Sequence, residues 1–298
     1  MVKRSFILGD EWLYYKIYSG AKTSDLILMD IIKPIAESLL KENIIDKWFF
    51  IRYADPKHHV RIRFHYNNPK AVGKIIDSLQ PHFIEYISED LIWKIQTDTY
   101  NRELERYGKH TMEFSETIFF HDSEAITNFL SLIEGEEGEE LRWLFGLRMV
   151  DALLDSFSFP NELKFKFLER LKTGFGNEFG MNRFLKKQLD NKYRQQKKKI
   201  EDFLAFDALE KPDYLPILQV LTTYKEALFP IAQRLNHLNS LKTLEIEIVN
   251  LLSSYIHMTM NRLFKSKNRI HEMVVYDFLY RYYKSTVARS NKKLVRHD

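Results

Sequence analysis

The chain has 298 residues, of which 45% are hydrophobic, and a formal net charge of +4 at pH 7. It contains no cysteine, which excludes a disulfide framework, thiolate metal sites and cysteine nucleophiles and suits a reducing cytoplasm. The first apolar run is too short for a signal peptide, and no stretch approaches the roughly 18 uninterrupted apolar residues of a membrane span. We therefore expect a cytoplasmic protein with a large apolar core, and the modest charge does not by itself indicate nucleic acid.

The first hundred residues alternate between strand and helix patterns. WLYYKIYS (12–19) predicts an aromatic strand. Apolar residues at helical spacing follow Ser24, a candidate N-cap, and Pro34 is expected to kink that helix.

A predicted hairpin, WFFIRY (48–53) and VRIRFHY (60–66), comes next, joined through Asp-Pro turn chemistry. A helix from NNP (67–69) and a strand at 91–100 complete a β-α-β-β-α-β order, the split βαβ arrangement of ferredoxin-like folds. In this sheet we expect the third strand to lie beside the first and the fourth strand to flank the second.

After about residue 110 the pattern is almost wholly helical. The predicted helices cover residues 123–133, 139–155, 161–172, 182–205, 214–240, 242–264 and 272–289. We expect the Gly-rich TGFGNEFG (173–180) to be a loop within one body. The fold class is therefore α+β, with a single domain (1–298) made of an α/β sheet subdomain (1–110) and a helical subdomain (111–298).

Two arginines share one face of a predicted strand in HHVRIRF (58–64). Val60, Ile62 and Phe64 alternate on the apolar face, so Arg61 and Arg63 lie about 7 Å apart on the other. A half-buried strand with a wet basic face explains this pattern. From this strand alone that explanation is favoured; the alternative is a carboxylate or phosphate site, because the planar guanidinium fork binds oxyanions in bidentate fashion. The adjacent His58 and His59 are a weak metal candidate.

A second arginine cluster follows the fourth strand in DTYNRELERYG (98–108). If the chain turns helical near Asn101, Arg102 and Arg106 lie one turn apart and Glu103 can pair with Arg106. An ordinary surface ion pair explains this spacing. The alternative places Arg106 at the end of the sheet, near Arg61 and Arg63.

The third feature is an uncharged polar stripe on the predicted helix 242–264. Asn250, Ser253 or Ser254, His257 and Asn261 recur at helical spacing among apolar residues. The stripe either lines an interior cavity or holds a hydrogen-bonded core histidine.

The three segments WFFIRYADPKHHVRIRF, TYNRELERYG and IHMTMNR, in this order, resemble the thiopeptide-type bacteriocin biosynthesis domain. This is the C-terminal, glutamate-eliminating domain of class I lantibiotic dehydratases. In that family, glutamate from glutamyl-tRNA is esterified onto Ser or Thr of a precursor peptide, and elimination leaves dehydroalanine or dehydrobutyrine. The fused enzymes begin with a much larger glutamylation domain, for which this chain has no room. The resemblance therefore implies a lyase, the elimination half of a split dehydratase.

The resemblance also implies roles for individual residues. The family's essential arginines fall on Arg61, Arg63 and Arg106, its acidic partner on Glu103 and its essential histidine on His257. The further substrate contacts expected are Arg52, Tyr100, Arg102 and Asn261. No cofactor and no metal are implied.

The implied partners are a ribosomally made precursor peptide and a separate glutamyl-tRNA-dependent glutamylation protein, with no direct tRNA requirement; a homodimer is compatible with the sequence. Two alternatives stay open. One is a pyridine-forming [4+2] cyclisation enzyme, and the other is a non-catalytic module that binds the peptide or the partner, for which the basic run 186–199 could serve.

Overall fold

The computed structural model describes residues 2–206 and 212–294. They form two compact units, the first made of residues up to Leu132 together with His237–Ser266, and the second of Ile133–Asn236 and the residues from Lys267 onward. The first unit is thus discontinuous in the chain. The sequence predicted two subdomains that are each continuous in the chain, with a boundary near residue 110. That the whole chain forms a single domain stays a prediction.

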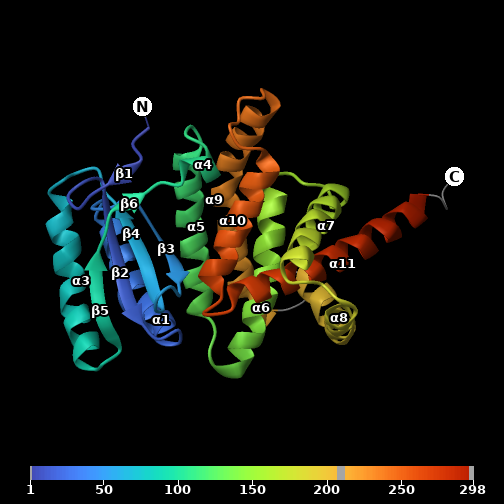
Figure 1. Cartoon of the computed structure of the whole chain (residues 1–298), viewed down its shortest axis with the longest axis horizontal. Coiled ribbons are helices and arrows are strands. Elements are labelled where there is room, and N and C mark those ends of the chain that lie inside the picture. The colour runs from blue at the N-terminus through green and yellow to red at the C-terminus, as the bar shows by residue number, and fades with distance from the viewer. Residues whose placement is uncertain (1, 207–211, 295–298) are drawn as a thin grey trace. The chain divides into compact units, whose positions relative to one another are not determined.

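A four-stranded antiparallel sheet organises the first unit (Figure 1). Its strands are β2 (Trp12–Ser19), β3 (Lys47–Tyr53), β4 (His59–His65) and β5 (Ile92–Thr97), in the order β3-β4-β2-β5. The predicted α+β class and βαββαβ order are confirmed, and the third predicted strand does lie beside the first.

The expected place of the fourth strand was wrong, because β5 pairs with β2 and not with β3. Side chains of two helices occupy the outer edge of β3 instead. The Phe50 amide donates to Ser123 Oγ at 3.2 Å, and the Arg52 amide donates to Asn261 Oδ1 at 2.9 Å. These bonds satisfy the backbone donors of an edge strand without a further strand.

Helices cover the apolar face of the sheet. One helical run follows β2, formed by α1 (Thr23–Leu26), the π-helical turn η1 (Ile27–Ile32) and α2 (Lys33–Lys41), and α3 (Ala71–Ser88) follows β4. The π-helical turn immediately precedes Pro34, whose missing N–H such a turn can accommodate. Ser24 is not the predicted N-cap, because it lies inside α1 and its hydroxyl donates to the Ala21 carbonyl at 2.7 Å.

Short elements and two long helices complete the first unit. The strand β1 (Ser5–Phe6) pairs with β6 (Tyr100–Asn101), and α4 (Leu104–Tyr107), α5 (Met112–Leu130) and α10 (Ile248–Leu263) follow in the chain. The helix expected near Asn101 begins later because Asn101 is held in this strand pair. Both α5 and α10 pack against β3.

The second unit is helical, as predicted for the C-terminal part of the chain. Its elements are α6 (Gly135–Ser156), α7 (Asn161–Glu178), α8 (Arg183–Ala205), η2 (Pro212–Tyr214), most of α9 (Leu215–Ser240), and α11 (Asn268–Leu294). The prediction of a loop at 173–180 was wrong, because α7 continues to Glu178. Phe175 packs edge-on against Tyr276 at 5.0 Å between ring centres, and such packing offsets the cost of glycine in a helix. None of the helices in 2–206 and 212–294 is long and apolar enough to cross a membrane.

Candidate functional site

The polar face of β4 carries the two arginines that the period-two pattern placed together. Val60, Ile62 and Phe64 are fully buried on the opposite face. Antiparallel pairing sets Arg61 opposite Lys16 of β2 and Arg63 opposite Tyr14 of β2. The register of these strands therefore decides which side chains surround each guanidinium.

Arg63 lies in an aromatic cage and is only 7% exposed. Its guanidinium carbon is 4.2 Å from the ring centre of Tyr14, 4.7 Å from that of Tyr100 and 5.2 Å from that of Phe49. Nε of Arg63 has no hydrogen-bond partner, and no carboxylate lies within ion-pair distance among the described residues. Burial lowers the pKa of this guanidinium from its ordinary value. The cage thus holds a desolvated cation with no ion-pair partner among the described residues.

Arg61 is half-buried over the ring of Tyr53, with its guanidinium carbon 3.6 Å from the ring centre. Its Nε donates a hydrogen bond to Nε2 of His59 at 3.0 Å. Within the described part of the chain, no carboxylate pairs with Arg61 either. Its positive charge contributes to the lowered pKa of Arg63, which places both guanidiniums within electrostatic reach of each other.

Glu103 and Arg106 form the predicted i,i+3 ion pair at 3.5 Å, and both side chains are partly exposed. Nε of Arg106 donates to Ser254 Oγ on α10 at 3.2 Å. The charge of Glu103 acts on Arg63 and opposes the lowering of its pKa. The charges of Arg61 and Glu103 thus both reach Arg63, and Arg106 is connected to them through its ion pair with Glu103.

His257 lies on α10 between two of these contacts. Ser254, one turn before it, binds Arg106, and Asn261, one turn after it, binds the backbone of Arg52 in β3. His257 itself is half-buried. The polar stripe predicted on this helix therefore faces α4 and the edge of β3, with Asn250 exposed at its start.

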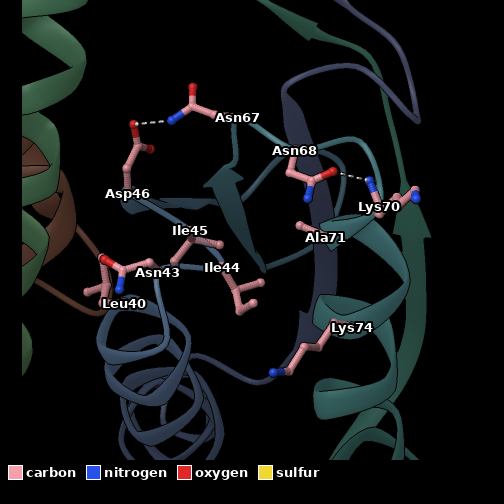
Figure 2. A pocket seen from close by; sticks show the side chains of 10 residues that line it. All are labelled: Leu40, Asn43, Ile44, Ile45, Asp46, Asn67, Asn68, Lys70, Ala71 and Lys74. Atoms are coloured by element: carbon pink, nitrogen blue, oxygen red, sulfur yellow. Dashed lines mark hydrogen bonds between the residues drawn. The ribbon is translucent and has the colours of Figure 1, made fainter.

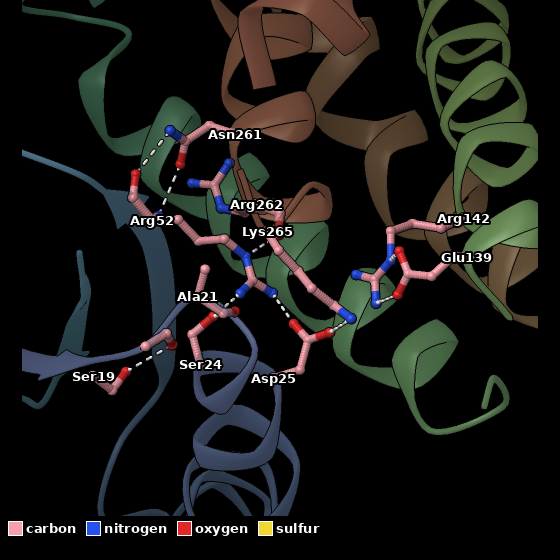
Figure 3. A network of polar contacts seen from close by, with 11 residues as sticks. Ser19, Ala21, Ser24, Asp25, Arg52, Glu139, Arg142, Asn261, Arg262 and Lys265 are labelled. Atoms are coloured by element: carbon pink, nitrogen blue, oxygen red, sulfur yellow. Dashed lines mark hydrogen bonds and ion pairs between the residues drawn. The ribbon is translucent and has the colours of Figure 1, made fainter. Parts of the chain in front are cut away.

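Arg52 is buried and its guanidinium is fully engaged by the protein (Figure 3). Nε donates to the Arg262 carbonyl at 2.8 Å, Nη1 to Ser24 Oγ, and Nη2 to Asp25 Oδ1 at 2.6 Å. Asn261 uses its amide to bind both the N–H and the C=O of Arg52, each at 2.9 Å. These contacts hold α1 and α10 to β3, and a role of Arg52 or Asn261 in substrate binding stays a prediction.

Arg102 is likewise engaged, by a buried carboxylate. Its Nε and Nη2 donate to the two oxygens of Glu116, each at 2.7 Å, and Nη1 donates to the Lys3 carbonyl at 3.2 Å. Burial by itself would lower the pKa of Arg102, but the hydrogen bonds and charge of Glu116 outweigh burial and raise it. Tyr100 donates its hydroxyl to the same Glu116 at 2.9 Å while its ring faces Arg63. The predicted substrate contacts of Tyr100 and Arg102 likewise stay predictions.

Sequence reasoning missed the side chains that surround the two arginines on the sheet. The contacts of Tyr14, Lys16 and Tyr53 with the arginine face, and the hydrogen bond from Arg61 to His59, were not predicted. Alternation in WLYYKIYS could have placed Tyr14 and Lys16 on one face of their strand. Only the pairing of that strand with β4 shows that this face is the one with the arginines.

A cavity of about 540 Å³ lies elsewhere in the first unit, between the end of α2 and the start of α3 (Figure 2). It is lined by polar residues, Asn43, Asp46, Asn67, Asn68, Lys70 and Lys74, and by the apolar Leu40, Ile44, Ile45 and Ala71. Asn67 donates to Asp46 at 3.4 Å, and Asn68 accepts from the Lys70 amide at 3.0 Å. None of the predicted site residues lines it.

Comparison with known proteins identifies relatives along nearly the whole chain. The model of the family described as lantibiotic biosynthesis dehydratase, C-terminal, matches residues 12–283. The subtilin biosynthesis protein SpaB of Bacillus subtilis is 26% identical over 275 residues, 89% of this chain and 25% of SpaB. The nisin biosynthesis protein NisB of Lactococcus lactis subsp. lactis is 33% identical over 134 residues, 44% of this chain and 13% of NisB. The chain thus spans a quarter or less of the length of these relatives.

Solved structures agree with this result at the level of the fold. The tRNA-dependent lantibiotic dehydratase MibB from Microbispora superposes with a TM-score of 0.74 at 20% identity, over 96% of this chain and 29% of MibB. The pyridine synthase TbtD from thiomuracin biosynthesis superposes with a TM-score of 0.60 at 12% identity, over 92% of this chain and 99% of TbtD. At such identities the likeness shows the fold alone.

Proposed function

Because the chain belongs to the lantibiotic biosynthesis dehydratase C-terminal family, we propose that it eliminates glutamate from glutamylated Ser and Thr residues of a ribosomally made precursor peptide. The products are free glutamate and a dehydroalanine or dehydrobutyrine residue. A glutamyl-tRNA-dependent glutamylation protein supplies the esterified peptide, so this step needs no tRNA. The observation that carries the proposal is the pair Arg61 and Arg63, two cations without a carboxylate partner among the described residues.

The elimination needs a base, a stabiliser of enolate charge and a clamp for the departing carboxylate. We assign the base to His257, because histidine is the side chain that most often serves as a general base and because His257 lies one helical turn from Ser254, the partner of Arg106. The base takes the Cα proton of the esterified residue, the electron pair forms the Cα–Cβ double bond, and the Cβ–O bond breaks to release the glutamate carboxylate. A carboxylate is a good leaving group, so no acid is needed on that side.

The arginines contribute charge and not proton transfer, because a guanidinium stays protonated in proteins. Arg61 and Arg63 are free to bind the glutamyl carboxylates or the enolate oxygen, and preorganised donors of this kind stabilise developing negative charge. Arg106 joins them from α4, oriented by Glu103 and Ser254. Arg52 and Arg102, whose guanidinium nitrogens all donate to protein groups, are assigned to the fold instead.

Mass spectrometry of a glutamylated precursor peptide tests the proposal. The peptide, prepared with glutamyl-tRNA and a glutamylating protein of this class, is incubated with and without this protein. Adducts that persist without it and become water-loss products with it support elimination. Arg63→Lys and His257→Gln should leave the adducts in place, whereas Arg183→Lys, on the exposed start of α8, should not.

Two results would overturn the proposal. In the first, the wild-type protein binds the glutamylated peptide but leaves the glutamyl adducts intact. This result would indicate a peptide-binding module. The other is conversion of an already dehydrated peptide into a ring product with no glutamate released, which indicates cyclisation.

A further inference from the structure

We propose that His59 is a positioning residue, a neutral imidazole that orients the Arg61 guanidinium toward a substrate carboxylate without neutralising its charge. This inference rests on the proposed elimination. His59 lies at the start of β4, beside the turn of the predicted hairpin, and its ring is almost completely buried at 1% exposure.

The two hydrogen bonds of the imidazole define its protonation. Nδ1 lies 2.8 Å from the Lys57 carbonyl oxygen, which can only accept, so Nδ1 carries a hydrogen. Nε2 lies 3.0 Å from Nε of Arg61, which can only donate, so Nε2 offers its lone pair. Both bonds form together only in the neutral Nδ1–H tautomer. Because both nitrogens are engaged, the weak metal candidate at this position has no free ligand atom on His59.

The surroundings of the ring favour the same state. Tyr18 of β2 stacks on it at 4.7 Å between ring centres, and Tyr53 of β3 lies at 5.5 Å. The charged and titratable groups that act on it are Arg61 and His58 on its own segment and Lys16 from β2. Burial lowers the pKa of His59, the bond to Lys57 opposes this, and the positive charges of Arg61 and Lys16 lower it further. A protonated ring would lose its bond to Arg61 and add a third cation.

A neutral orienting group has a consequence that a carboxylate would not have. Glu116 holds Arg102 with two hydrogen bonds and neutralises it in the process. His59 uses only Nε of Arg61, so both Nη groups keep their donors, with no protein acceptor for them among the residues that the structure describes. The result is a fixed guanidinium whose outer edge and full charge remain for an oxyanion.

Three variants of His59 separate orientation from charge. His59→Gln can still accept from Nε of Arg61 through its amide oxygen and should keep kcat/KM for elimination within about threefold of wild type, since the positioning contact survives. His59→Phe keeps the ring but not the acceptor and should lose about 10- to 100-fold, because Arg61 is no longer held in place. His59→Glu keeps Arg61 in place but neutralises it, so KM for the glutamylated peptide should rise strongly.

A merely structural histidine would give a different ranking. In that case His59→Phe would be as active as His59→Gln. Alternatively, the activities of the three variants would fall in proportion to their losses in the free energy of unfolding, which is measured by urea denaturation. Either result would overturn the positioning role.

NMR gives a readout that does not depend on elimination. Long-range ¹H–¹⁵N spectra of the full chain, with the His59 signals assigned from their loss in His59→Gln, should show a neutral ring with the hydrogen on Nδ1 at neutral pH. A hydrogen on Nε2, or a charged ring, would overturn the inference. The expected tautomer in a wild-type protein that does not eliminate glutamate would overturn the proposed function and leave the orientation of Arg61 by His59 intact.

Discussion

Arg102 and Arg63 are buried to almost the same degree, 6% and 7% exposed, on either side of Tyr100. Glu116 encloses Arg102 with two charge-assisted hydrogen bonds, whereas aromatic rings enclose Arg63 and leave its Nε without a partner. Removing a cation from water costs several kcal/mol; a paired carboxylate offsets much of that cost, and a desolvated cation–π contact offsets about 2 kcal/mol. Desolvation of Arg63 is therefore offset less completely within the protein than that of Arg102: burial lowers the pKa of Arg63, whereas Glu116 raises the pKa of Arg102.

The paired and unpaired arginines of the first unit differ in what they connect. Arg52 and Arg102 each connect segments distant in sequence through partners that are part of the chain. Arg61 and Arg63 connect nothing within the chain by an ion pair, among residues 2–206 and 212–294. The proposed anion-binding role of Arg61 and Arg63 therefore rests on their lack of an ion-pair partner among the described residues and not on the number of arginines.

The largest change in stability is expected when Arg102, the arginine paired with Glu116, is replaced. Arg102→Met leaves the Glu116 carboxylate buried and unpaired, so the free energy of unfolding should fall by about 3–5 kcal/mol in urea denaturation. Arg63→Met breaks no ion pair, and the same measurement should change by less than about 1 kcal/mol or show stabilisation. Equal losses in the two variants would remove the distinction. The double variant Arg102→Met/Glu116→Leu should recover most of the lost stability.

Substitution of Arg63, which has no ion-pair partner among the described residues, should lower the rate of elimination and leave stability nearly unchanged. Arg63→Lys keeps a positive charge but not the planar fork, so the rate of glutamate elimination should fall by about 10²- to 10³-fold. Circular dichroism and the urea midpoint should stay near wild type. A lysine variant that eliminates glutamate at the wild-type rate would show that Arg63 is a structural residue of the cage.

The pH dependence of stability sharpens the comparison further. Burial lowers the pKa of His58, His59 and His121 in the folded first unit. Below the ordinary histidine pKa of about 6.5 the unfolded chain binds protons that the folded chain does not, so the free energy of unfolding falls as pH decreases toward the folded pKa values. His59→Gln should reduce this fall relative to wild type between about pH 7.5 and 5. An unchanged dependence would mean that His59 takes up its proton equally in both states.

The smallest effect is expected for the exposed pair. Glu103 is 64% and Arg106 34% exposed in their side chains, so screening by water leaves their ion pair worth less than about 1 kcal/mol. Glu103→Gln should hardly change the urea midpoint. Elimination should nevertheless slow by about tenfold, because Arg106 loses its orienting partner. A stability loss above about 2 kcal/mol would place Glu103 with Glu116 as a fold-forming carboxylate.

Local periodicity predicted much of this architecture. The bounds of β2 were predicted as the structure has them, and alternation placed Arg61 and Arg63 on one face. The cage around Arg63 could not be predicted, because it depends on the register of β2 and β3 with β4 and on the return of Tyr100 through β6. These are pairings between distant segments, for which a single sequence carries no direct signal. The same limit explains the misplaced β5 and the Gly-rich end of α7, whose helix is fixed by packing on Tyr276.

The amide of Asn261 has a mechanical consequence. It binds both the N–H and the C=O of Arg52, as a residue of a neighbouring strand would. The two hydrogen bonds attach α10 to the edge of β3 and fix its position along that strand. His257 is one turn from Asn261, and the arginines of β4 are one strand away from Arg52. A slide of α10 along the sheet would break both bonds at once, so these bonds restrain the proposed base relative to the strand beside Arg61 and Arg63.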